Sequence, residues 1–164
     1  MPTTAVGKVA PEFRLPSSNG ETYSLKEALA QGPVLAAFFK VGCPCCQFTL
    51  PFVERLYRQF SGVHPRIWGI SQDSAADSRR LAEEFGLTFP ILIDEKPYAV
   101  SKQYGLQYVP TLVLIAPDGH IELSGDGFSK SDLIEIHKYM SAHYAIKPPV
   151  LFQPDEQIPQ YKPG

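Results

Sequence analysis

The chain has 164 residues, enough for one domain with a buried core, and its 44% hydrophobic and 20% charged residues are typical of a globular protein. Its formal net charge of -2 does not favour binding to nucleic acid or to an acidic membrane surface. No apolar stretch approaches the roughly 20 residues that span a bilayer, and Met1 to Ala10 lack a charged start followed by an apolar run. We therefore expect a cytoplasmic protein with neither nucleic-acid nor membrane partners.

The N-terminal third predicts a hairpin, a short helix and a buried strand. Residues 10–25 mix turn-forming residues with short alternating segments, which indicates a hairpin. Ser24 is expected to cap a helix that runs to about Gln31, with Glu27 three residues on completing a capping box. The continuous apolar run Val34–Phe39 is typical of a strand buried on both faces.

A cluster of cysteines follows that strand at once, in the run Gly42-Cys43-Pro44-Cys45-Cys46. Apolar residues then recur at helical spacing, so the cysteines are expected to open a helix. These residues are Phe48, Pro51, Phe52, Leu56, Tyr57 and Phe60. Pro51 should kink the helix, because proline lacks a backbone donor and clashes with the preceding turn.

The rest of the chain alternates between strands and helices. Strands are predicted at 67–71, 90–93, 111–115 and 121–123, with a hairpin turn at 118–119 before the last of them. Ser74 caps a predicted helix that ends at Gly86, and a short helix is expected over 98–104. Ser129 caps the last helix, whose apolar positions include Leu133, Ile134, Ile136, His137 and Met140.

This order predicts an α/β domain with a central mixed sheet and helices on both of its faces. We place the domain at residues 1–146. Residues 147–164 contain five prolines, too many for a helix or an inner strand. They are expected to form an extended tail that either lies along the surface or is mobile.

The three cysteines favour local chemistry over a structural disulfide framework, which would join distant segments. Residues three apart share one face of a helix, so geometry selects Cys43 and Cys46 as a redox pair. A metal site is the rival interpretation, and an inert cluster is a second one. A closed zinc site needs four ligands, which only the scattered histidines could complete. These are His64, His120, His137 and His143.

The helix N-terminus explains why Cys43 would be the reactive sulfur. Unsatisfied N–H groups and the helix dipole stabilise a thiolate there, so we expect Cys43 to have a lowered pKa and to attack first. Lys40 lies three residues upstream and could add to this effect, or be a solvated charge. Cys46, one turn deeper, would then attack the mixed disulfide and release the partner.

The run Phe38 to Cys46, followed by Pro51, resembles the active-site strand, turn and first helix of thioredoxins. The segment Val109-Pro110-Thr111 before an apolar strand is similar to their second hallmark. The resemblance implies a thioredoxin-like fold in which Pro110 is cis and lies beside the cysteines. It also implies a substrate groove lined by Pro44, Val109, Pro110 and Thr111.

The segments Val9–Phe13 and Trp68–Ser74 resemble the redoxin branch of this superfamily, the alkyl hydroperoxide reductase/thiol-specific antioxidant (AhpC/TSA) proteins and cytochrome-maturation thioredoxins. Two departures stand out. The proline and threonine that precede the reactive cysteine of peroxiredoxins have no counterpart before any of the three cysteines, and their arginine has none beside Pro110. The buried acid of thioredoxins is replaced by Ala37, and the glutamate of the cytochrome-maturation relatives by Thr49.

The leading hypothesis is a thiol–disulfide oxidoreductase that reduces or exchanges disulfides through Cys43 and Cys46, in antioxidant defence or redox homeostasis. Its partners would be a thiol- or disulfide-bearing protein or small molecule and an upstream dithiol reductant, with no cofactor and no metal. Cys45 is either a spectator, a second resolving thiol or a site of oxidation. The alternatives are a thiol peroxidase of the peroxiredoxin kind, a copper-binding thioredoxin-like module and a binding domain whose chemistry has decayed.

Overall fold

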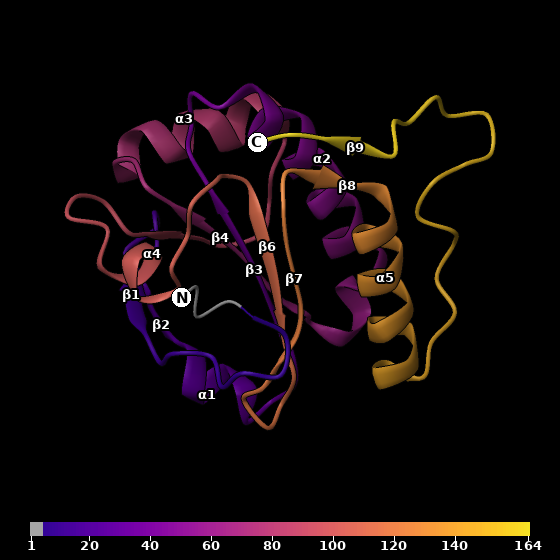
Figure 1. The fold of residues 1–164 in the computed structure, drawn as a ribbon, viewed down its shortest axis with the longest axis horizontal. Coiled ribbons are helices and arrows are strands. Elements are labelled where there is room, and N and C mark those ends of the chain that lie inside the picture. Colours follow the sequence, from indigo (N-terminus) through magenta and orange to yellow (C-terminus); the bar gives the residue numbers. More distant parts are fainter. Residues whose placement is uncertain (1–4) are drawn as a thin grey trace.

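The computed structural model describes residues 5–164, so the first four residues of the predicted domain lie outside the described part of the chain. The central sheet contains β3 (Val34–Phe39), β4 (Arg66–Ser71), β5 (Ile91–Ile93), β6 (Thr111–Ile115) and β7 (Ile121–Asp126). Their order across the sheet is β5-β4-β3-β6-β7 (Figure 1). The pairs β3–β4 and β4–β5 are parallel, whereas β6 runs antiparallel to both β3 and β7. The predicted mixed sheet is therefore confirmed.

Helices cover both faces of this sheet. They are α1 (Leu25–Leu29), α2 (Pro44–Gln59), the 3-10 turn η1 (Ser61–Val63), α3 (Ala75–Phe85), α4 (Ala99–Gln103) and α5 (Lys130–Tyr144). None of the helices in residues 5–164 combines the length and the apolar composition that crossing a membrane would need.

The central strand β3 divides the core into two layers, because successive side chains of a strand point to opposite faces. Odd-numbered residues of β3 pack with α2, α3 and α5, represented by Leu50, Leu81 and Ile136. Even-numbered residues pack with α1, α4 and the N-terminal segment, represented by Leu25 and Val100. Every side chain of β3 is at most 1% exposed. The turn that follows β3 is thus attached to the most deeply buried strand.

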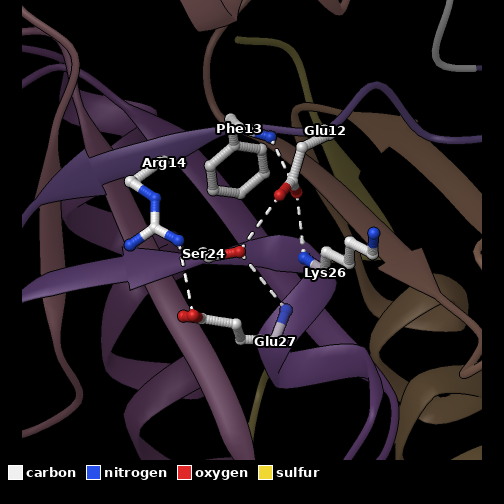
Figure 2. Close-up of polar contacts among 6 residues, drawn as sticks. All are labelled: Glu12, Phe13, Arg14, Ser24, Lys26 and Glu27. Atoms are coloured by element: carbon white, nitrogen blue, oxygen red, sulfur yellow. Dashed lines mark hydrogen bonds and ion pairs between the residues drawn. The ribbon is translucent and has the colours of Figure 1, made fainter.

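The N-terminal hairpin consists of β1 (Arg14–Pro16) and β2 (Thr22–Ser24), paired antiparallel as predicted. Ser24 caps α1 by accepting a hydrogen bond from the backbone N–H of Glu27 at 3.3 Å. The capping box differs from the prediction, because the Glu27 carboxylate pairs with Arg14. Glu12 supplies the carboxylate at the helix start, accepting from Ser24 Oγ at 3.0 Å and from the N–H of Lys26 at 2.9 Å (Figure 2).

The other predicted helix ends agree closely with the structure. Ser74 and Ser129 cap α3 and α5 through their side chains, and Gly86 ends α3 with a left-handed φ of 67°. The helix α2 continues as helix through Pro51 to Gln59. The strand β7 extends three residues beyond the predicted 121–123, because it pairs along the whole of β6.

The tail over residues 147–164 follows the surface and returns to the body of the molecule. Leu151 is only 3% exposed, and Glu156 accepts a bidentate pair of hydrogen bonds from Arg55. Its last part forms β9 (Tyr161–Lys162), which pairs antiparallel with β8 (Phe128–Ser129) at the end of β7 (Figure 1). Neither short strand is predicted by the sequence, and the division at residues 146 and 147 remains a prediction.

Candidate active site

The cysteine run lies at the turn between β3 and α2. Cys43 is the N-cap of α2 with extended backbone angles, and Pro44 occupies the first turn, where its missing N–H costs nothing. The Cys43 sulfur accepts a hydrogen bond from the backbone N–H of Cys46 at 3.1 Å. The first turn of α2 thus directs a backbone N–H group at this sulfur. Cys43 is partly exposed, so this sulfur can meet a partner.

Two side chains that the sequence analysis did not single out fix the turn before Cys43. The carboxylate of Asp73 accepts from the N–H of Val41 at 2.7 Å, and the Gln47 side chain donates to the Val41 carbonyl at 2.9 Å. Asp73 follows β4, the parallel neighbour of β3. Parallel strands bring their carboxyl ends to the same edge of a sheet, so an acid two residues after β4 lies near the turn that follows β3. This position is the sequence signal that could have identified Asp73.

Cys46 is fully buried one turn into α2. Burial raises the pKa of the Cys46 thiol well above its usual range, and the hydrogen bond with Cys43 acts in the same direction. A backbone hydrogen bond from Lys40 acts in the opposite direction. The contribution of Lys40 to Cys46 therefore comes from its main chain, and its side chain is exposed. None of the three cysteines is in a disulfide in this structure.

Cys45 has a different partner from the other two cysteines. Its side chain is 9% exposed, and its sulfur donates to the carbonyl of Lys162 at 3.5 Å. Lys162 belongs to the tail at residues 147–164. The third cysteine thus joins the start of α2 to the far end of the described chain.

Most of the residues expected to line the groove lie near Cys43. The Val109–Pro110 peptide bond is cis, as the resemblance implied, and Cys43 Sγ donates to the Val109 carbonyl at 3.6 Å. Val109 also lines a hollow of about 220 Å³ together with Lys40 and Tyr108. We call this the Val109 hollow; its remaining lining residues are Gln72, Tyr98, Leu106 and Gln107. Pro44 is exposed at the same helix start.

Thr111 occupies a different position from the other predicted groove residues. It is 5% exposed, and its hydroxyl donates to the Tyr108 carbonyl at 2.7 Å, which closes the loop before β6. It lines a separate cavity of about 130 Å³ with Ser124 and Asp126, whose lining contains no cysteine. Thr111 therefore stabilises the loop before β6 through this hydrogen bond.

The two positions at which the related families carry an acid, residues 37 and 49, hold no carboxylate in this chain. Ala37 is fully buried in β3. Thr49 is also fully buried, and its hydroxyl donates back to the Cys45 carbonyl within α2 at 2.7 Å. Within residues 5–164, no group of three or more His, Cys, Asp or Glu side chains is arranged to hold a metal ion.

The mixed sheet, the two cysteines three residues apart at a helix start and the cis-proline beside them define a thioredoxin-fold protein. A crystal structure of the thioredoxin domain of a thiol-disulfide oxidoreductase from Bacteroides vulgatus matches with a TM-score of 0.72 at 24% identity, over 83% of this chain and 97% of that one. At this identity the match shows the fold alone.

The chain belongs to the AhpC/TSA family, whose model matches residues 6–124. It is 30% identical to thiol-disulfide oxidoreductase ResA of Halalkalibacterium halodurans, over 79% of this chain and 73% of that protein. It is 32% identical to bcp of Helicobacter pylori, which is named provisionally as a peroxiredoxin, over 61% of this chain and 67% of that protein. The predicted family and the assignment to oxidoreductases are both confirmed.

Proposed function

We propose that this protein reduces or exchanges disulfides by using Cys43 as the attacking thiol and Cys46 as the resolving thiol. The observation that carries the proposal is the 3.1 Å hydrogen bond from the Cys46 N–H to the Cys43 sulfur. It places a partly exposed sulfur at the start of a helix, with the second sulfur buried one turn further on.

The proposed reaction has two steps. The Cys43 thiolate attacks one sulfur of the substrate disulfide, which forms a mixed disulfide and releases the other sulfur as a thiolate that takes up a proton. Cys46 then loses its proton to water and attacks Cys43 Sγ, which releases the second substrate thiol. The substrate gains two electrons and two protons, and the enzyme is left with a disulfide between Cys43 and Cys46. An external dithiol must return it to the reduced form.

The relative named ResA supports disulfide chemistry rather than any particular substrate. In a reducing cytoplasm, the location expected from the sequence, the reaction would run towards reduction of the partner. Roles in antioxidant defence or redox homeostasis belong to the same proposal. The partner would be a disulfide-bearing protein or small molecule.

The proposal is tested with three serine variants and the disulfide of insulin as substrate, with dithiothreitol as the reductant. Cys43→Ser should lower the rate to the level of the reductant alone, and Cys46→Ser should accumulate a mixed disulfide that mass spectrometry detects. Cys45→Ser removes a thiol outside the reacting pair and should retain Cys43-dependent reduction, because its side chain contacts the tail instead of the other sulfurs. Full activity of Cys43→Ser would overturn the proposal.

A peroxidase function is the second candidate, favoured by the relative bcp. It predicts that one equivalent of hydrogen peroxide converts a cysteine to a sulfenic acid, which dimedone labelling would detect. The sequence lacks the proline and threonine that peroxiredoxins place before their reactive cysteine. We therefore expect slow labelling compared with the reaction of Cys43 with a disulfide.

A further inference from the structure

The end of the described chain returns to the cysteines. The strand β9 pairs with β8, so that Lys162 lies opposite Phe128 and Tyr161 opposite Ser129. Figure 1 shows the tail passing outside α5 before β9 comes back beside β8, next to α2. We call residues 161–164 the return segment.

The backbone of the return segment lies against two groups close to Cys43, which are the Cys45 thiol and the Val109 carbonyl. The Lys162 carbonyl accepts the hydrogen bond from Cys45 Sγ at 3.5 Å. Gly164 lies so close to Val109 that a side chain at this position would overlap the Val109 carbonyl. The same carbonyl accepts from Cys43 Sγ at 3.6 Å. The return segment therefore lies next to the Val109 carbonyl oxygen, which also contacts the Cys43 sulfur.

The contacts made by the side chains of the return segment itself are few and solvent-exposed. Tyr161 is 53% exposed, and its hydroxyl donates to Asp126 at 3.2 Å. The Lys162 ammonium lies 4.5 Å from the centre of the Phe48 ring. The Lys162 carbonyl lies directly beside Gly127, in the space that a side chain on residue 127 would occupy. Contacts of this kind allow the segment to leave while the core stays folded.

A disulfide must bring one sulfur into contact with Cys43 Sγ before exchange occurs. A polypeptide that carries this sulfur must also pass its flanking backbone over the surface around Cys43, including Val109. A small disulfide has no flanking backbone and needs only the space at the sulfur itself. The return segment occupies part of the surface that a polypeptide needs.

We propose that the return segment competes with polypeptide substrates for the surface at Val109, so that protein disulfides reach Cys43 only when residues 161–164 have left. Small disulfides react with the segment in place. This inference rests on the proposed disulfide chemistry of Cys43. Cys45 is a positioning residue in it, since its thiol holds the Lys162 carbonyl.

Two full-length variants test the competition. The double variant Tyr161→Ala/Lys162→Ala removes both side-chain contacts. Gly127→Ala keeps both side chains but places a methyl group against the Lys162 carbonyl and the Tyr161 ring, at a backbone φ of 72° that favours glycine. If both variants change the rates in the same way, the cause is release of the segment and not loss of the Lys162 charge, because Gly127→Ala keeps that charge. Asp155→Asn, a change in the exposed part of the tail upstream, is the matched control. Backbone hydrogen exchange of residues 161–164 reports release independently of activity.

The measurement compares rates with insulin, a protein disulfide, and with cystamine, a small disulfide without peptide groups. Release should raise the insulin rate by at least about fivefold, because apparent affinity scales with the fraction of open molecules, and should leave the cystamine rate within about twofold. Asp155→Asn should change neither rate. Faster exchange with an unchanged or lower insulin rate would overturn the competition, as would an equal rise for both substrates.

Failure of the proposed function itself would look different. In that case the unaltered chain would reduce neither insulin nor cystamine faster than Cys43→Ser does. The competition alone fails when Cys43-dependent reduction is present but release does not favour insulin over cystamine.

Discussion

Cys43 and Cys46 have the same side chain but different surroundings. Cys43 is partly exposed at the helix start, and Cys46 is fully buried. Burial, the largest cause, raises the pKa of Cys46. It persists when Cys43 is bonded to a substrate, whereas the hydrogen bond between the two thiols is lost. In the proposed second step, the buried thiol is therefore still protonated at neutral pH when it attacks.

This difference makes the second step depend on pH. Because the pKa of Cys46 is raised, the thiolate fraction should grow about tenfold for each pH unit between about 7 and 9. We expect the release of substrate from the Cys43 mixed disulfide to accelerate by the same factor. Rapid mixing of a preformed mixed disulfide at several pH values measures it. A rate that is flat over this range would show that a group in the protein removes the proton.

Among single residues, the cysteines can be found from the sequence, but the residues that contact them and their turn cannot. The spacing of Cys43 and Cys46 follows from helix geometry alone, so it can be predicted. The contact of Asp73 with Val41 depends on two strands that are distant in sequence and adjacent in space. The contact of Cys45 with Lys162 joins residues 117 positions apart, and no local pattern encodes it.

At the level of elements, α2 is fixed to the loop before β5 by one buried carboxylate. Glu54 is 5% exposed, and its oxygens accept from the N–H and the hydroxyl of Thr88, from the N–H of Phe89 and from Arg58. Removing the carboxylate leaves the N–H of the buried Phe89 without a partner, whereas Thr88 is exposed and its donors can turn to water. Arg58 is 64% exposed at its side chain and can turn to solvent.

The two members of this ion pair should therefore differ in their effect on stability. Glu54→Ala should lower the free energy of unfolding by about 1–3 kcal/mol, since the buried N–H of Phe89 loses its acceptor. Arg58→Ala should cost less than about 1 kcal/mol, as expected for an exposed partner. Urea denaturation of both variants measures the difference. Equal losses would mean that the charge pair, rather than the backbone contacts, supplies the stability.

Secondary structure could be predicted where the signal is local. The caps Ser24, Ser74 and Ser129 all accept hydrogen bonds at the predicted helix starts. The carboxylate at the start of α1 comes from Glu12 instead of the predicted Glu27, because the extended segment before the hairpin passes beside the helix (Figure 2). The strands β8 and β9 were missed because each has two residues and forms only through pairing of the tail.

At the scale of the whole molecule, the stability of the fold should fall at alkaline pH. Tyr104 is fully buried against the N-terminal segment, and its hydroxyl donates to the Pro11 carbonyl at 2.7 Å. Burial raises the pKa of Tyr104 well above its ordinary value. Above pH 10 the unfolded chain loses this proton while the folded chain keeps it, so the stabilisation present below pH 10 is lost as the pH rises.

Tyr104→Phe isolates this contribution. The variant should be less stable by about 1 kcal/mol at pH 7, because it loses the hydrogen bond. Between pH 9 and pH 11 the unaltered chain should lose about 1.4 kcal/mol of stability relative to the variant, since only the tyrosine is deprotonated on unfolding. The initial gap should therefore close, and the variant should become slightly the more stable of the two. Denaturant titrations at the two pH values, with the cysteines kept reduced, measure the gap. Parallel losses of stability would contradict the assignment to Tyr104.

The position of β3 at the centre of the sheet has a consequence for partly opened molecules. In amide exchange, centrally placed strands open only with global unfolding, whereas short exposed segments open at little cost. The Cys43 turn is anchored to the former class, and the exposed two-residue strand β9 belongs to the latter. Mild denaturant should therefore detach the end of the chain first, and a loosened molecule would keep its thiol chemistry until the whole sheet melts.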